Sequence, residues 1–232
     1  MAGRPDGRRL AAAIRAFLII GVVLALTAAI SSIGRTNGAG SGASTAGGSS
    51  AVARPGVPGH EVYGFVPYWE MDDSIAAHLR ATDTTTIGLF SVTHARSGAI
   101  DADQNGFRRV TGPVGRRIVA DARAAGRRVE VAWTSFGRAK NDRLFASLEL
   151  QDRVIEGLVE LRADLDVDGI AVDVEEMDEA DIPAYGLFVG RLRSALRAAA
   201  PAATITVTTG AGPQGAAMAL AAGLAGADRI FL

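Results

Sequence analysis

The chain has 232 residues, 24 Lys and Arg against 25 Asp and Glu, a formal net charge of −1 and no cysteine. The absence of cysteine excludes disulfides, lipid attachment through cysteine and thiolate metal sites. The basic residues are dispersed along the chain instead of forming a concentrated patch, so we expect no nucleic-acid partner.

The N-terminal region is typical of a membrane anchor. Residues 1–15 form a short basic segment, and residues 16–34 form an apolar run that is long enough to cross a bilayer. Basic residues before the run, with few after it, predict an N-terminus inside the cell and an external C-terminal part. We therefore predict a transmembrane signal-anchor and a single-pass protein of the cell membrane. Cleavage near Ala28, which would leave a secreted protein, is the alternative.

A tether and a folded domain are expected after the apolar run. Residues 35–59 are rich in Gly, Ser and Pro, a composition that predicts a flexible linker without chemistry of its own. From residue 60 to residue 232, short strand-like runs alternate with helical patterns, which favours the α/β class with parallel strands. Six strands are predicted, over residues 62–69, 86–92, 128–135, 168–175, 204–209 and 228–232.

The fourth predicted strand, Asp168–Glu175, is the most informative segment. Because side chains alternate along a strand, Ala171, Asp173 and Glu175 share one side, and the β-branched residues between them share the other. The β-branched side requires an apolar cover of helices. The side with the small and acidic residues is then expected to face a barrel interior, with both carboxyl groups at its mouth.

The spacing of the two acids indicates a chemistry. Asp173 and Glu175 are separated by two residues of strand, roughly 6–7 Å, so each carboxyl group can shift the ionisation of the other. One can remain charged while the other keeps a proton. This division suits glycoside cleavage, in which a protonated acid reaches the leaving oxygen and a neighbouring group stabilises an oxocarbenium-like transition state. Glycoside hydrolysis is therefore the leading hypothesis.

The same segment resembles the strand-four signature of glycoside hydrolase family 18, the chitinase-like barrels, which reads Asp-Gly-x-Asp-x-Asp-x-Glu. Ala171 stands in place of the second acid, as in members similar to the spore-cortex and germination glucosaminidases, which carry a non-acidic residue there. The resemblance implies a TIM (β/α)8-type barrel. It also implies that Glu175 is the general acid and that Asp173 orients the substrate's N-acetyl group, whose carbonyl oxygen acts as the nucleophile.

The resemblance further implies the substrate class. The expected partner is an N-acetylated polysaccharide, chitin or peptidoglycan, and the expected activity is that of a glycosidase without a cofactor or a metal ion. Three aromatic residues are candidates for stacking on a sugar face: Tyr68 and Trp69 at the end of the first strand, and Trp133 at the end of the third. The alternative for Tyr68 and Trp69 is an ordinary position in the core or at the rim of the barrel, and the alternative for Trp133 is a filler of the rim.

The number of strands predicts an incomplete barrel. A barrel of this type has eight strands and about 250 residues, and the family places a tyrosine after strand six and a tryptophan on strand eight that this sequence does not contain. We therefore expect a fragment or a truncated product, and we expect the 232-residue chain alone to be inactive or feeble on N-acetylglucosamine oligomers.

Two alternatives to a hydrolase remain open. A non-catalytic module that binds envelope glycans could keep the aromatic contacts without cleaving the substrate. The second alternative is a calcium-binding loop, because Asp164, Asp166, Asp168 and Gly169 followed by Glu175 fit the EF-hand pattern. In that case we expect Pro183 to interrupt the helix that should leave the loop.

Overall fold

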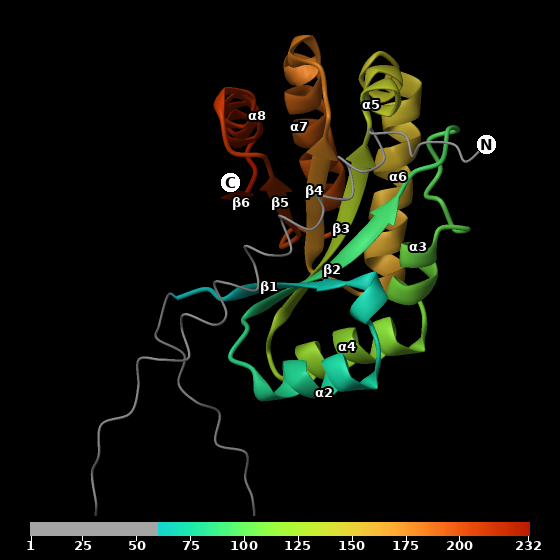
Figure 1. Ribbon diagram of the computed structural model, residues 1–232, viewed down its shortest axis with the longest axis vertical. Helices are drawn as coiled ribbons and strands as arrows, with labels where there is room; N and C mark the ends of the chain where they lie inside the picture. The colour runs from blue at the N-terminus through green and yellow to red at the C-terminus, as the bar shows by residue number, and fades with distance from the viewer. Residues whose placement is uncertain (1–59) are drawn as a thin grey trace, which may run out of the picture. The chain divides into compact units, whose positions relative to one another are not determined.

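The computed structural model describes residues 60–232 (Figure 1). They form one parallel sheet in the order β1-β2-β3-β4-β5-β6. The six predicted strands are confirmed, with ends that shift by a residue or two. The strands are β1 (Tyr63–Pro67), β2 (Thr86–Thr93), β3 (Arg128–Phe136), β4 (Gly169–Glu175), β5 (Thr204–Thr208) and β6 (Arg229–Phe231).

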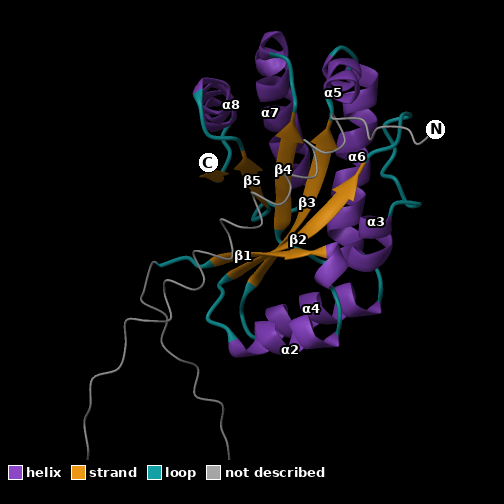
Figure 2. Ribbon diagram, in the orientation of Figure 1, coloured by secondary structure: helices purple, strands orange, loops and turns teal. Residues whose placement is uncertain are grey.

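Helices connect successive strands and cover one side of the sheet (Figure 2). Two 3-10 turns, η1 (Tyr68–Glu70) and η2 (Glu179–Asp181), follow β1 and β4. The helices are α2 (Asp73–Ala81), α3 (Asn105–Val110), α4 (Pro113–Ala124), α5 (Arg138–Phe145), α6 (Leu148–Leu165), α7 (Ile182–Ala199) and α8 (Pro213–Leu224). In Figure 1 they follow the sheet from α2 and α4 at the bottom to α7 and α8 at the top.

The predicted basic segment, membrane segment and linker lie outside the described residues. From residue 60 to residue 232, no helix combines the length and the apolar character that a membrane crossing requires.

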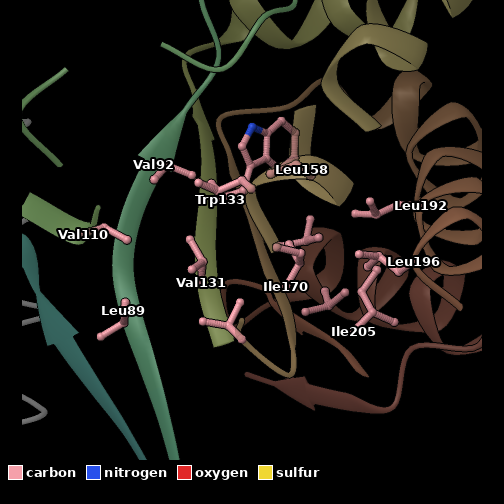
Figure 3. Close-up of a cluster of buried hydrophobic side chains, with 14 of the residues drawn as sticks. Leu89, Val92, Val110, Val131, Trp133, Leu158, Ile170, Leu192, Leu196 and Ile205 are labelled. Atoms are coloured by element: carbon pink, nitrogen blue, oxygen red, sulfur yellow. The ribbon is translucent and has the colours of Figure 1, made fainter. Parts of the chain in front are cut away.

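The hydrophobic core lies between the helices and the outer face of the sheet (Figure 3). The β-branched residues of β4 provide its centre, as the alternation predicts: Ile170 and Val172 are fully buried. They pack with apolar positions that recur along α6 and α7, among them Leu158 and Leu192. Burial of each such side chain contributes about 1.5–3 kcal/mol, which fixes β4 with its other face toward the interior.

The inner face of the sheet is lined by small residues at its centre. Ala132, Ala171 and Thr206 are neighbours in register on β3, β4 and β5. At Gly169, one step nearer the start of β4, an added Cβ would lie 2.2 Å from the carbonyl oxygen of Thr204. Only glycine therefore permits the close approach of β4 and β5 at this point.

The sheet curls far enough for its two edge strands to make contacts across the interior. Arg229 of β6 forms an ion pair with Glu61, just before β1, at 2.7 Å. The rings of Tyr63 and Phe231 meet edge to face with centroids 5.0 Å apart. A curled, parallel, six-stranded sheet with helices outside is the architecture of an incomplete TIM barrel, as the sequence predicts.

Candidate active site

A row of polar side chains crosses the carboxyl ends of four neighbouring strands. Thr93 of β2 pairs with Thr134 of β3, Thr134 pairs with Asp173 of β4, and Asp173 pairs with Thr208 of β5. Glu175 lies two residues further along β4, in register with Phe136. Active sites of β/α barrels are built at this end of the strands, which makes the row the candidate active site.

Asp173 is partly buried and, among residues 60–232, accepts a hydrogen bond from one donor. The Thr208 hydroxyl donates to its Oδ1 at 2.5 Å. Burial raises the pKa of the Asp173 carboxyl above its ordinary value of 3.8, and the hydrogen bond from Thr208 opposes that rise. The net result is a carboxyl group that keeps its proton to a higher pH than an exposed aspartate does.

Glu175 lies at the solvent-exposed end of β4, on the same side as Asp173. Desolvation of its carboxyl group raises the pKa above its ordinary value of 4.5, and the negative charges of Asp173 and Glu176 raise it further. No residue from 60 to 232 donates a hydrogen bond to this carboxyl group. A carboxylic acid that retains its proton and is not occupied by a protein donor is suited to act as a general acid.

Ala171 changes the surroundings of Asp173. It is fully buried between Ala132 and Thr206, so no carboxyl group lies beneath Asp173 on the inner face. Within the described part of the chain, no other acid lies in the row of Asp173 or in the row below it, so none is placed there to share its proton. Thr208 is its hydrogen-bond partner.

Trp69 is the best placed of the three aromatic candidates. It belongs to η1, directly after β1, and its side chain is 50% exposed. Its ring meets that of Phe90, in the middle of β2, edge to face with centroids 6.2 Å apart. Tyr68 precedes it, but is partly buried and packs against the core. An exposed indole at the rim can stack on a ligand at the carboxyl ends of the strands.

Trp133 is placed differently from its predicted role in sugar contact. It is 0% exposed and lies among the buried side chains of the core (Figure 3). Its ring packs against that of Phe188 of α7 with centroids 5.3 Å apart. Its neighbour in register on β4 is Val172, so it belongs to the helix-covered face, opposite Asp173. The alternation of β3 explains this, because Val129, Val131 and Trp133 share one face.

Phe136 is an aromatic residue that the sequence interpretation did not select. It has the same parity on β3 as Thr134, is 43% exposed and is the in-register neighbour of Glu175. Thr134 and Thr208 were also not selected, because their proximity to Asp173 depends on strand register. The parity of Phe136 was visible in the sequence, since an alternating strand that buries Val129 and Val131 must present Phe136 on the other face.

The EF-hand alternative is wrong. Asp164 lies within α6, Asp166 ends that helix in a left-handed conformation, and the carboxylate of Asp168 accepts a hydrogen bond from the Val129 amide at 2.7 Å. Glu175 lies at the far end of β4 from these residues. Pro183 occupies the first turn of α7 and begins that helix rather than interrupting it, because a first-turn proline loses no hydrogen bond. The part of the chain that the structure describes contains no cluster of three potential metal ligands.

No protein-family model matches the sequence, and no curated protein sequence matches it significantly. Solved structures do resemble the fold. The spore cortex-lytic enzyme SleL of Bacillus cereus is 16% identical, with a TM-score of 0.54, over 64% of this chain and 34% of that one. A class V chitinase from Pseudomonas fluorescens is 16% identical, with a TM-score of 0.61, over 73% of this chain and 52% of that one. A chitinase from Chromobacterium violaceum is 16% identical, with a TM-score of 0.57, over 74% and 55%.

These similarities identify the fold of the described residues as that of the chitinase-like and cortex-lytic barrels. The chain spans between about a third and a little over half of the length of these structures.

Proposed function

We propose that this chain carries the acid side of a glycosidase site that cleaves N-acetylglucosamine-containing glycans by substrate-assisted acid catalysis. The observation that supports it most is the pair Asp173 and Glu175, on one face of one barrel strand, each with a raised pKa. The chitinase-like fold supports it in turn, because this strand end is where such a barrel builds its chemistry.

Each carboxyl group has a distinct part in the proposed reaction. Glu175 donates its proton to the glycosidic oxygen as the bond from that oxygen to the anomeric carbon breaks. Asp173 accepts a hydrogen bond from the N–H of the substrate's acetamide group, and the acetamide oxygen forms a bond to the anomeric carbon. The Glu175 carboxylate then removes a proton from water, whose oxygen opens the cyclic intermediate and completes hydrolysis.

The surroundings favour a sugar over a more polar ligand. Trp69, directly after β1, and Phe136, at the end of β3, are each about half exposed near the carboxyl ends of the strands, and an apolar ring face packs well against the C–H face of a pyranose. We expect the predicted signal-anchor, residues 16–34, to hold this domain at the cell membrane, facing external glycans such as peptidoglycan or chitin.

The test compares the protein and its Glu175→Gln variant on N-acetylglucosamine oligomers and on the same oligomers after de-N-acetylation. The expected result is release of reducing ends, however slow, that requires both Glu175 and the acetyl groups. Release from the de-N-acetylated oligomer at the same rate would contradict the substrate-assisted mechanism. If the unmodified protein shows no release of reducing ends and no binding to either oligomer, the glycosidase proposal as a whole is contradicted.

A glycan-binding module is the second candidate. It is favoured by Ala171, which leaves Asp173 without an inner acid, together with the exposed Trp69. Retention of the protein on insoluble chitin or peptidoglycan, without release of reducing ends and unchanged by Glu175→Gln, would select this candidate. Loss of retention in Trp69→Ala would then identify the binding surface.

A further inference from the structure

A buried amide supports the end of β4. Asn141 of α5 is 0% exposed, and its Nδ2 donates a hydrogen bond to the main-chain carbonyl oxygen of Glu175 at 2.6 Å. The hydroxyl of Ser135, also fully buried, donates to Oδ1 of Asn141 at 2.6 Å. Because Ser135 occupies the amide oxygen, the Asn141 amide is held with its nitrogen toward Glu175.

This support lies where the sheet holds β4 on one side only, through its pairing with β3. The pairing of β4 with β5 ends at Asp173 and Thr208, so Glu175 has no partner on β5. The next residue, Glu176, has a φ of 59°, a left-handed conformation in which the chain leaves the strand direction. The Glu175 carbonyl receives the Asn141 bond and a longer one, at 3.3 Å, from the Gly137 amide.

We propose that Asn141, oriented by Ser135, is a positioning residue that fixes the Glu175 carboxyl group relative to Asp173. The support acts through the main chain of Glu175 and does not touch the substrate. The effect of this support on the reaction rate rests on the proposed function. The positioning of the Glu175 carboxyl group by Asn141 does not depend on that function. A displacement of about 1 Å at a catalytic group is enough to cost on the order of 100-fold in rate, so a support of this kind has a measurable effect.

The two properties of Glu175 that depend on position are its partial desolvation and its distance from Asp173. Both raise its pKa. If the end of β4 is released, the carboxyl group samples more hydrated positions further from Asp173, and its pKa moves down toward its ordinary value. A general loss of stability elsewhere in the domain leaves that local environment unchanged in the folded state.

The test follows the carboxyl carbon of Glu175 by NMR through a pH titration, with Glu175→Gln used to assign the signal. The variants are Asn141→Ala and the milder Ser135→Ala. The matched control is Gln151→Ala, which removes another buried amide beside α5, one that donates to the carbonyls of Leu144 and Phe145 at 3.3 and 3.2 Å and not to Glu175.

We expect the midpoint of Glu175 to fall by about 0.5 pH unit or more in Asn141→Ala, less in Ser135→Ala, and not in Gln151→Ala. Melting temperature should fall in all three variants. An unchanged midpoint in Ser135→Ala and Asn141→Ala, with melting temperatures that fall as in the control, would overturn the proposal. If Asn141→Ala does not fold, an unchanged midpoint in Ser135→Ala overturns it alone.

The same variants separate this proposal from the proposed function. If the unmodified protein neither binds nor cleaves glycans but the midpoint shifts in Asn141→Ala, the support stands and the glycosidase proposal fails. Where glycan release is measurable, Asn141→Ala should lower kcat by about 10-fold or more and leave KM nearly unchanged, because only the proton donor is displaced.

Discussion

The carboxyl groups at the two ends of the inner face of the sheet differ in the number of hydrogen-bond donors they have. Near the amino end, Glu130 is fully buried and accepts hydrogen bonds from the hydroxyls of Tyr63 and Thr204, at 2.9 and 2.6 Å, and from Arg229 at 2.7 Å. At the carboxyl end, Asp173 has only the Thr208 hydroxyl, and Glu175 has no donor among the described residues.

The number of hydrogen-bond donors distinguishes Glu130, which we assign a structural role, from Asp173 and Glu175, which we propose take part in catalysis. At the amino end the charge is compensated, and the same arginine also binds Glu61, so the network joins both edge strands. At the carboxyl end burial is compensated less, and the pKa of each acid is raised, as is common for the acids of active sites. The burial of a carboxyl group alone therefore does not indicate a catalytic role. The number of hydrogen-bond donors to that group is the more informative observation.

The largest expected effect is on activity. Glu175→Gln removes the proton donor while keeping the size of the side chain, so we expect the release of reducing ends from N-acetylglucosamine oligomers to fall by about 10²–10⁴-fold. The free energy of unfolding should not fall at neutral pH, because no described residue donates a hydrogen bond to this carboxyl group and its ionised form is disfavoured in the folded state. A large loss of stability in the same variant would place Glu175 in the structural class with Glu130.

Glu130→Gln should produce the opposite pattern. It breaks a buried ion pair with Arg229 and leaves hydroxyl donors facing an amide, so we expect a loss of about 3–5 kcal/mol in the free energy of unfolding. The matched substitution at the other end is Asp173→Asn, which removes a carboxyl group with a single donor and should cost much less. Urea denaturation of both variants measures the difference, and equal losses would remove the distinction between the two ends.

The raised pKa values of Asp173 and Glu175 should make the free energy of unfolding depend on pH. Because the folded-state pKa values of Asp173 and Glu175 are raised, the folded protein holds these protons more tightly than the unfolded chain. Their contribution to stability is therefore greatest at low pH and is lost as the pH rises from the ordinary values of 3.8 and 4.5 through the raised ones.

Subtracting the stability curve of the double variant Asp173→Asn, Glu175→Gln from that of the unmodified protein isolates this contribution. Groups whose pKa is lowered, such as Asp178 beside Arg138, act in the opposite direction and cancel in the difference. A difference curve that rises with pH across this window would contradict the assignment.

The smallest expected effect concerns the one donor at the carboxyl end. Thr208→Val removes the hydroxyl that lowers the pKa of Asp173 and keeps a side chain of similar shape. The midpoint of Asp173 in an NMR titration should therefore rise further. A fall in the Asp173 midpoint would show that the hydrogen bond favours the protonated form instead.

The sequence predicted the faces of β4 correctly because both sides of that strand carry a clear signal: β-branched residues on one, small and acidic residues on the other. The same alternation applied to β3 would have assigned Trp133 to the core, since it follows Val129 and Val131 on their face. Trp133 was selected as a sugar contact because it is aromatic, and the alternation of β3 was not applied to it.

Other features depend on information that one sequence does not carry. Thr208 lies 35 residues from Asp173, and the two meet only through strand register. The support by Asn141 depends on the path of α5 after β3. The false EF-hand pattern arose because a helix end and a parallel strand placed acidic residues at the spacing of a calcium loop, and only the backbone conformation separates the two.

The most direct test of the central claim is the pH titration of the Glu175 carboxyl carbon in the folded protein, followed by NMR. The account predicts a midpoint above the ordinary value of 4.5 that falls when Asp173 is replaced by Asn, because the neighbouring charge is part of the cause. A midpoint at or below 4.5, or one that does not respond to Asp173→Asn, would contradict it.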